Sequence, residues 1–142
     1  MTTKIRILLA EDQAMVRGAL TALLNLEEDL EVVAEVSQGD LVLPTAKKTK
    51  PDIALLDIEM PGSDGLSAAH ALHENLPACR IVILTTFGRS GYLRRAMESG
   101  AVGFLLKDAP ADQLAIAIRR VMAGERVVDP ELALSALSEG DN

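Results

Sequence analysis

Five short aliphatic runs, separated by segments with helical periodicity, constrain the fold of this chain more than any other feature. Several of the runs are apolar without a break, which is typical of strands covered on both faces of a parallel sheet. The predicted strands are Ile5–Ala10, Glu31–Val36, Ile53–Asp57, Arg80–Thr85 and Val102–Leu106. Five strand–helix pairs in one stretch predict an α/β fold, a doubly wound, five-stranded parallel sheet with helices on both faces.

The predicted helices lie between and after these strands, and apolar residues at helical spacing mark their core faces. They begin near Gln13, Gly39, Leu66, Gly91 and Pro110. The first helix has its apolar face on Val16, Leu20, Leu23 and Leu24, and the last on Leu114, Ile118, Val121 and Met122.

The pattern changes near Glu125, where Val127-Val128-Asp129-Pro130 leads into a short leucine pattern and then a polar end. This tail is too short to form a domain of its own. We therefore expect one globular domain over residues 1–124 and, over residues 125–142, a linker or a short helix.

Composition narrows the expected partners and the compartment. The formal net charge of −7 argues against direct nucleic-acid binding, which needs clustered Lys and Arg, and the chain has few aromatic rings for stacking on bases. The single Cys79 excludes an internal disulfide and fits a reducing cytoplasm. The sequence shows neither the apolar core of a signal peptide nor a segment of membrane-spanning length, so we expect a cytoplasmic protein with no membrane partner.

Four of the predicted strands end in polar residues, at the edge where open parallel sheets bind ligands. Glu11 and Asp12 follow the first strand, Asp57 ends the third, Thr85 ends the fourth and Lys107 follows the fifth. Taken singly, these residues have ordinary explanations, such as a helix cap for Asp12 or a surface position for Lys107. Random loop polarity would not place all of them at one edge, so we interpret them together as a site.

Three carboxylates in a partly dry crevice repel one another unless a cation neutralises them. Oxygen ligands suit Mg²⁺, whereas His70, His73 and Cys79 lie away from this edge and argue against zinc. A carboxylate beside Mg²⁺ can attack a phosphoryl group in line, which would convert Asp57 to an aspartyl phosphate. The lysine would neutralise phosphoryl oxygens, and the threonine hydroxyl could hydrogen-bond one of them.

Four motifs, in order along the chain, resemble the receiver domains of bacterial two-component response regulators. They are Glu11-Asp12, residues 55–62 (Leu-Leu-Asp-Ile-Glu-Met-Pro-Gly), residues 83–87 (Ile-Leu-Thr-Thr-Phe) and residues 103–108 (Gly-Phe-Leu-Leu-Lys-Asp). The likeness covers roughly residues 4–124. The Leu-Leu-Lys-Asp-Ala form and the tail at residues 124–130 most resemble the LuxR/NarL-type subfamily, whose receivers precede a helix-turn-helix domain.

The resemblance implies a role for each residue at this edge. Asp57 would be the phosphoacceptor, Lys107 would contact the phosphoryl group, and Thr85 and Phe104 would be the switch residues. The implied ligands of Mg²⁺ are Asp12 directly, Glu11 through water, Asp57, and the main-chain carbonyl of Glu59.

The resemblance also implies how the chain would work. A sensor histidine kinase would supply the phosphate, small phosphodonors could substitute, and the chain would be no enzyme beyond self-phosphotransfer and slow autodephosphorylation. Phosphorylation would switch conformation and dimerisation and so control transcription, with DNA contacted only by a domain absent from this chain. We expect the flavodoxin-like strand order 2-1-3-4-5. The chain departs from the commoner pattern in its Glu-Asp pair and in Asp108, which replaces a proline and removes any expectation of a cis peptide bond.

The expected readout lies on helices. The end of the fourth strand, the helix Gly91–Ser99 and Phe104 form the expected bistable element, with Gly88 and Gly91 flanking a movable loop, Arg89-Ser90. The outward residues of the first helix are Ala14, Gly18, Thr21 and Ala22, and those of the last are Ile116 and Ala123. These faces predict a homodimer, promoted by phosphorylation, through the first and last helices.

Three alternative functions stay open. Asp57-Ile-Glu59 weakly resembles the Asp-x-Asp start of haloacid-dehalogenase-type phosphatases, although the Glu and the lack of a cap domain count against this. A flavodoxin-like binding module would share the sheet, but Glu11-Asp12 would repel the phosphate that such a module binds after its first strand. A stand-alone receiver that acts by protein docking is the third alternative.

Overall fold

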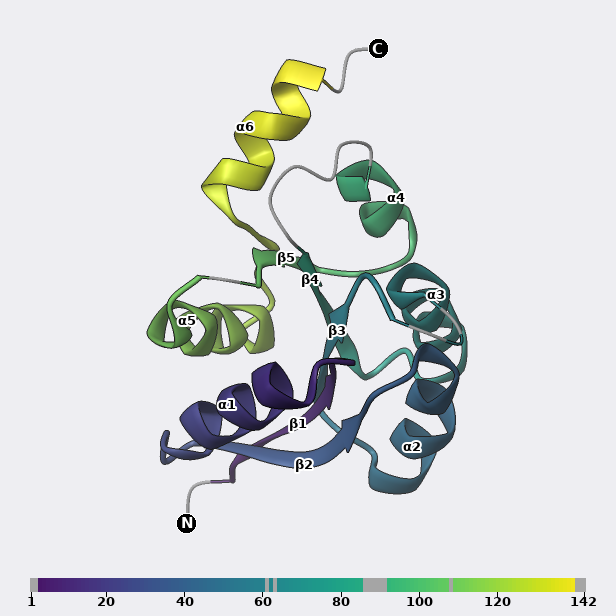
Figure 1. Ribbon diagram of the computed structural model, residues 1–142, viewed down its shortest axis with the longest axis vertical. Helices are drawn as coiled ribbons and strands as arrows, with labels where there is room; N and C mark the ends of the chain where they lie inside the picture. The colour runs from purple at the N-terminus through teal and green to yellow at the C-terminus, as the bar shows by residue number, and fades with distance from the viewer. Residues whose placement is uncertain (1–2, 61, 63, 86–91, 108, 140–142) are drawn as a thin grey trace.

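The computed structural model of the protein describes residues 3–60, 62, 64–85, 92–107 and 109–139 (Figure 1). Its centre is a six-stranded parallel sheet in the order β2-β1-β3-β4-β5-β6. The strands are β1 (Ile5–Ala10), β2 (Leu30–Val36), β3 (Ile53–Asp57), β4 (Arg80–Thr85), β5 (Gly103–Leu106) and β6 (Val127–Val128). All five predicted strands are present, within one residue at each end, and in the predicted order.

The predicted count of five strands is wrong, because β6 pairs with the outer edge of β5. Gly103 lies opposite Val127 and Phe104 opposite Val128. Two residues between charged neighbours show no aliphatic run, so local pattern does not identify them as a strand. Val127 and Val128 form a strand because the free edge of β5 offers them hydrogen-bond partners.

Helices cover both faces of the sheet, as predicted (Figure 1). They are α1 (Ala14–Asn25), α2 (Val42–Thr49), α3 (Gly65–Asn75), α4 (Tyr92–Glu98), α5 (Ala111–Met122) and α6 (Pro130–Glu139). A 3₁₀ turn at Gly39–Leu41 precedes α2, so the predicted start at Gly39 is the start of this turn. Gly91, the predicted start of the fourth helix, lies outside the described residues.

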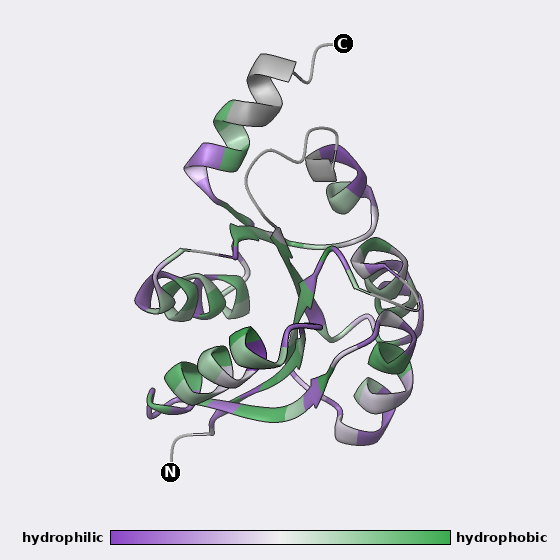
Figure 2. Cartoon of the chain, viewed as in Figure 1, coloured by the Kyte–Doolittle hydropathy of each residue, from purple (hydrophilic) through white to green (hydrophobic). Residues whose placement is uncertain are grey.

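Alternating side chains of the buried strands form two apolar layers. Ile7, Leu9 and Leu55 face one layer with residues of α1 and α5, whereas Leu8 and Leu56 face the other, with residues of α2 and α3. Figure 2 shows the apolar residues gathered along the strands and on the inner sides of the helices. The unbroken apolar runs of the sequence therefore reflect burial on both faces.

The core face of α1 is narrower than predicted. Leu24 is buried, and Val16 and Leu20 are half-buried, but the side chain of Leu23 is 45% exposed. Successive residues on a helix are rotated by about 100°, so Leu23 and Leu24 cannot both face the sheet squarely. Thr21, predicted to face outward, is half-buried instead.

The segment after Gly124 joins the sheet and then forms α6. The Asp129 N–H donates to the Phe104 carbonyl (2.8 Å), and Asp129 Oδ1 accepts the N–H of Glu131 (2.8 Å) at the start of the helix. Leu132 is buried in the same apolar cluster as Phe104. Of the two structures expected for this tail, the short helix is the one observed. Within the described part of the chain, no helix has both the length and the apolar character to cross a membrane.

Candidate functional site

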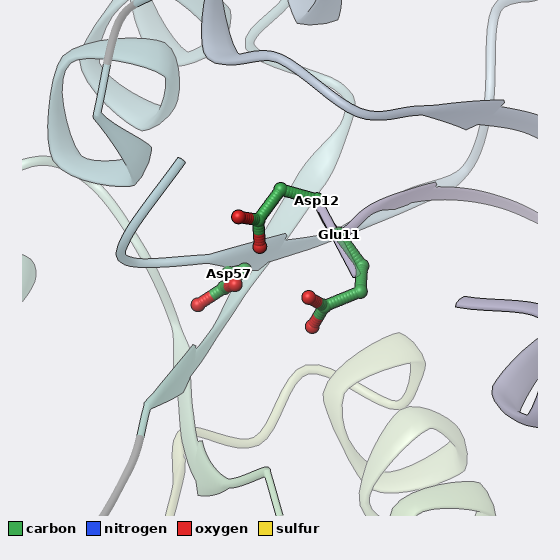
Figure 3. Close-up of side chains that lie close together, drawn as sticks. All are labelled: Glu11, Asp12 and Asp57. Atoms are coloured by element: carbon green, nitrogen blue, oxygen red, sulfur yellow. The ribbon is translucent and has the colours of Figure 1, made fainter. Parts of the chain in front are cut away.

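The acidic residues predicted to form a site meet at the carboxyl edge of the sheet. Glu11 and Asp12 follow β1, Asp57 ends β3, and β1 and β3 are adjacent parallel strands. One carboxylate oxygen from each of the three residues lies within 4.8 Å of the others (Figure 3). Glu11 and Asp57 are buried, whereas Asp12 is exposed. Parallel pairing thus gathers three negative charges in one partly dry place.

Lys107 reaches into this cluster from the end of β5. Its Nζ lies 3.0 Å from Asp57 Oδ2 and 2.9 Å from Glu11 Oε1, and its main-chain N–H donates to the Thr85 carbonyl (2.8 Å). Burial lowers the pKa of Lys107, but the contacts with Glu11 and Asp57 outweigh it, and the net pKa is raised. The lysine is therefore charged at neutral pH. Its contribution to stability is complete below its unfolded pKa and is lost as pH rises through the higher folded pKa.

Burial makes the charge of Glu11 unfavourable. Burial raises its pKa, and the charge of Asp57 adds to this, while the N–H of Gln13 and the ammonium of Lys107 lower it; the net pKa is raised. A carboxyl group whose pKa is higher in the folded protein binds its proton more tightly there, so its ionised form destabilises the fold. The ionised site therefore favours a further cation.

The donor atoms of the site fit Mg²⁺. Glu11 Oε2 accepts the Gln13 N–H (3.0 Å), but Oε1 is buried and, among the described residues, has only the ionic contact with Lys107 and no well-directed hydrogen bond. The three side chains that gather here all offer carboxylate oxygens, which hard divalent cations prefer. Asp57 Oδ1 accepts the Glu59 N–H (3.2 Å), which brings the Glu59 main chain beside the cluster.

The two predicted switch residues lie on the same side of neighbouring strands. Thr85 ends β4, and Phe104 of β5 pairs with Ile83 of β4. The side chains of Thr85 and Phe104 are both buried. Phe104 belongs to the apolar cluster that contains Ala96 of α4. Residues two apart in a strand share a face, so Thr85 faces the Phe104 side. The predicted movable loop, residues 88–91, lies outside the described residues, as does Asp108.

Gly65 positions the site, although no sequence motif identified it. It is the first residue of α3, and its N–H donates to the Ile58 carbonyl (3.0 Å). A Cβ at this position would lie 2.3 Å from the carbonyl oxygen of Asp57 and 2.7 Å from the Cα of Ile58. The first turn of α3 thus packs against the main chain of Asp57, and only glycine allows this approach.

Gly65→Ala is expected to lower the free energy of unfolding by about 1–3 kcal/mol, because two backbone segments must separate to admit the methyl group. Gly18→Ala is the matched control. Gly18 lies within α1, and a Cβ added to it would meet no atom within 4 Å, so this change should raise stability by about 0.5–1 kcal/mol. Urea unfolding of both variants measures the difference. Equal stability of the two variants would contradict the close packing at Gly65.

The chain is similar to known proteins over most of its length. A family model described as the response regulator receiver domain matches residues 7–119. The transcriptional regulatory protein DesR of Bacillus subtilis is 50% identical over 137 residues, which cover 96% of this chain and 68% of DesR. The oxygen regulatory protein NreC of Staphylococcus haemolyticus is 38% identical over 136 residues, which cover 95% of this chain and 63% of NreC. The chain therefore spans about two thirds of the length of these relatives.

Solved structures show the same fold. A LuxR-family two-component response regulator from Aurantimonas sp. SI85-9A1 superposes with a TM-score of 0.90 at 29% identity, covering 99% of this chain and all of that one (100%). The signal receiver domain of the putative response regulator NarL from Mycobacterium tuberculosis superposes with a TM-score of 0.82 at 30% identity, covering 87% of this chain and 99% of that one.

Proposed function

Because this chain belongs to the response regulator receiver domains, the signalling modules of two-component systems, we propose that Asp57 accepts a phosphoryl group from a sensor histidine kinase. One observation carries the proposal: Lys107 contacts both Asp57 and Glu11 inside a cluster of three carboxylates at the ligand-binding edge of the sheet. The buried acids attract a cation, and the lysine provides a positive charge beside the carboxylate that would react.

Asp12, Glu11, Asp57 and the main-chain carbonyl of Glu59 are the groups that would hold Mg²⁺. When bound, the ion would offset negative charge on the carboxylates and on the incoming phosphoryl group. A carboxylate oxygen of Asp57 would form the new bond to phosphorus, and the bond from phosphorus to the kinase histidine would break, leaving its electron pair on the imidazole nitrogen. Lys107 would neutralise one phosphoryl oxygen, and the Thr85 hydroxyl would donate a hydrogen bond to another.

The proposal is tested by intact-mass analysis after incubation with acetyl phosphate and Mg²⁺. We expect one phosphoryl group per chain, stable enough to detect as a stoichiometric adduct. Repeated turnover of phosphomonoesters without such an adduct would favour a phosphatase, and a flavin absorbance spectrum in the purified protein would favour a flavodoxin-like module.

We further propose that phosphorylation promotes a homodimer through α1 and α5. The two helices cover the same face of the sheet, and both carry large exposed apolar residues. These are Met15 (88% exposed) and Leu26 (76%) at the two ends of α1 and Ile116 (52%) on α5. Ala14, Gly18, Ala22 and Ala123 are exposed as predicted, and their small side chains permit close approach.

An ion-pair cluster holds α5 to the turn after α1. Arg119 Nε and Nη2 each donate to Asp29 (both 2.8 Å), and Nη2 also contacts Glu27 Oε1 (2.6 Å). The guanidinium hydrogen bonds lower the pKa of Asp29. This bidentate contact links α5 to the turn after α1, beside the proposed interface.

Phosphorylated protein is therefore expected to dimerise more tightly than unphosphorylated protein in sedimentation experiments over a wide concentration range. Ile116→Glu should weaken the dimer by about tenfold or more, because it places a charge in a desolvated contact. Leu41→Glu is the matched control, since Leu41 is similarly exposed (43%) but precedes α2 on the opposite face of the sheet. One mass for both phosphorylation states, or equal effects of the two changes, would reject this interface.

The whole regulator is proposed to act on transcription. DesR is named a transcriptional regulatory protein, and this chain aligns with 68% of it. We propose that the receiver predicted over residues 1–124 also includes β6, which completes its sheet, that the rest of residues 125–142 leads toward a DNA-binding domain, and that DNA is contacted only there. A protein of this kind is expected in the cytoplasm.

A further inference from the structure

Arg17 links the acidic loop to two neighbouring elements. It lies in the first half of α1, and its Nη1 donates to the main-chain carbonyl of Glu11 (2.6 Å). Its Nε lies 3.6 Å from Glu35 Oε1 on β2, and its side chain is only 22% exposed. The guanidinium therefore lies between the β1–α1 loop and the outermost strand on that side of the sheet.

The Glu11 carbonyl that accepts this hydrogen bond belongs to the peptide group that joins Glu11 to Asp12. On its other side, the Glu11 N–H donates to the Val36 carbonyl (3.0 Å), so Glu11 is held at both its main-chain groups. Asp12 is exposed, and packing does not fix its carboxylate. The direction of the Asp12 side chain then depends strongly on the peptide group that Arg17 holds.

We propose that Arg17 is a positioning residue for the cation site: by holding the Glu11–Asp12 peptide group, it keeps both carboxylates turned toward Asp57. The inference rests on the proposed function, since it takes Glu11 and Asp12 as ligands of Mg²⁺. Arg17 lies one hydrogen bond behind the ligands, where partners of this kind commonly change metal affinity by about 10–100-fold. A purely structural anchor between α1 and β2 would instead change stability alone.

The test is calorimetric titration of the unphosphorylated protein with MgCl₂. Arg17→Ala is expected to weaken Mg²⁺ binding by about tenfold. Arg17→Lys should recover part of this loss, because an ammonium can still donate to the carbonyl but lacks the planar guanidinium fork. Glu35→Gln is the matched control. It removes the ion pair with Arg17 and leaves the Glu11 contact, so its Mg²⁺ affinity should stay within about twofold of that of the parent.

Urea unfolding without Mg²⁺ separates positioning from structure. Lower stability of Arg17→Ala with an unchanged Mg²⁺ affinity would overturn the inference, as would equal affinity losses in Arg17→Ala and Glu35→Gln. If Arg17→Ala does not fold, the comparison of Arg17→Lys with the parent decides in the same way. Binding is measured without any phosphodonor, so a parent protein that binds Mg²⁺ but takes up no phosphoryl group would reject the proposed function alone.

Discussion

Asp57→Ala is expected to abolish phosphoryl uptake from acetyl phosphate. Asp57 is the carboxylate that contacts Lys107 Nζ through Oδ2 and the Glu59 N–H through Oδ1, so it lies where both a cation and a hydrogen-bond donor are in place. Alanine leaves no nucleophile at this position, and the neighbouring carboxylates follow a different strand. Intact-mass analysis of parent and variant, treated identically, should show one phosphoryl group on the parent and none on the variant.

Glu59→Gln is the matched control for this experiment. It removes a nearby negative charge but keeps the main-chain N–H and carbonyl that lie beside Asp57. The variant should still take up one phosphoryl group. A phosphoryl group on Asp57→Ala would show that another residue is the nucleophile, and peptide mapping would then identify it. If Glu59→Gln also lost phosphoryl uptake, the loss in Asp57→Ala would be explained by the removal of a negative charge near the site and not by the removal of the nucleophile.

Lys107→Ala is expected to slow phosphoryl uptake by about a hundredfold, since it removes the positive charge beside the reacting carboxylate. The same change should lower the unfolding free energy of the metal-free protein by about 2–3 kcal/mol, because it leaves two buried carboxylates without their ammonium. The side chains of Glu11 and Asp57 are 0% and 3% exposed in the parent, so water compensates for the lost positive charge only in part. Saturating Mg²⁺ should restore much of this stability.

Two further variants separate charge from packing at this position. Lys107→Met keeps the apolar stem and removes the ammonium, so it should match the alanine variant in rate. Lys107→Arg keeps a positive charge and should retain more of the stability than of the rate, because the guanidinium differs in shape. Phosphoryl uptake is followed by intact mass in samples quenched at timed intervals. A parent-like rate for Lys107→Met would show that the lysine charge does not assist the reaction.

Much of the fold follows from local pattern. The unbroken apolar runs identify five strands, because a strand buried on both faces needs apolar residues at every position. Once those strands are parallel, their carboxyl ends share an edge. The strand order expected from the resemblance makes β1 and β3 neighbours, so the acidic residues that follow them lie close together. The expected meeting of Glu11, Asp12 and Asp57, with Lys107 among them, needed only this topology.

Contacts between distant segments could not be predicted in this way. The two residues of β6 become a strand only because β5 offers them a free edge. Leu23 and Leu24 have the same hydropathy, and the angle at which α1 lies on the sheet decides which of them is buried. Gly65 has no motif of its own, and its role appears only where α3 contacts the Asp57 backbone.

The amino-acid sequence by itself determined the order of strands and helices and the chemistry collected at one edge of the sheet, because both follow from periodicity and from parallel pairing. Only the tertiary structure decided that the Lys107 ammonium contacts both Glu11 and Asp57. It also decided which neighbours, Arg17 among them, hold the Glu11–Asp12 loop. These depend on distances of a few ångströms between residues far apart in the chain, and local sequence carries no record of such distances.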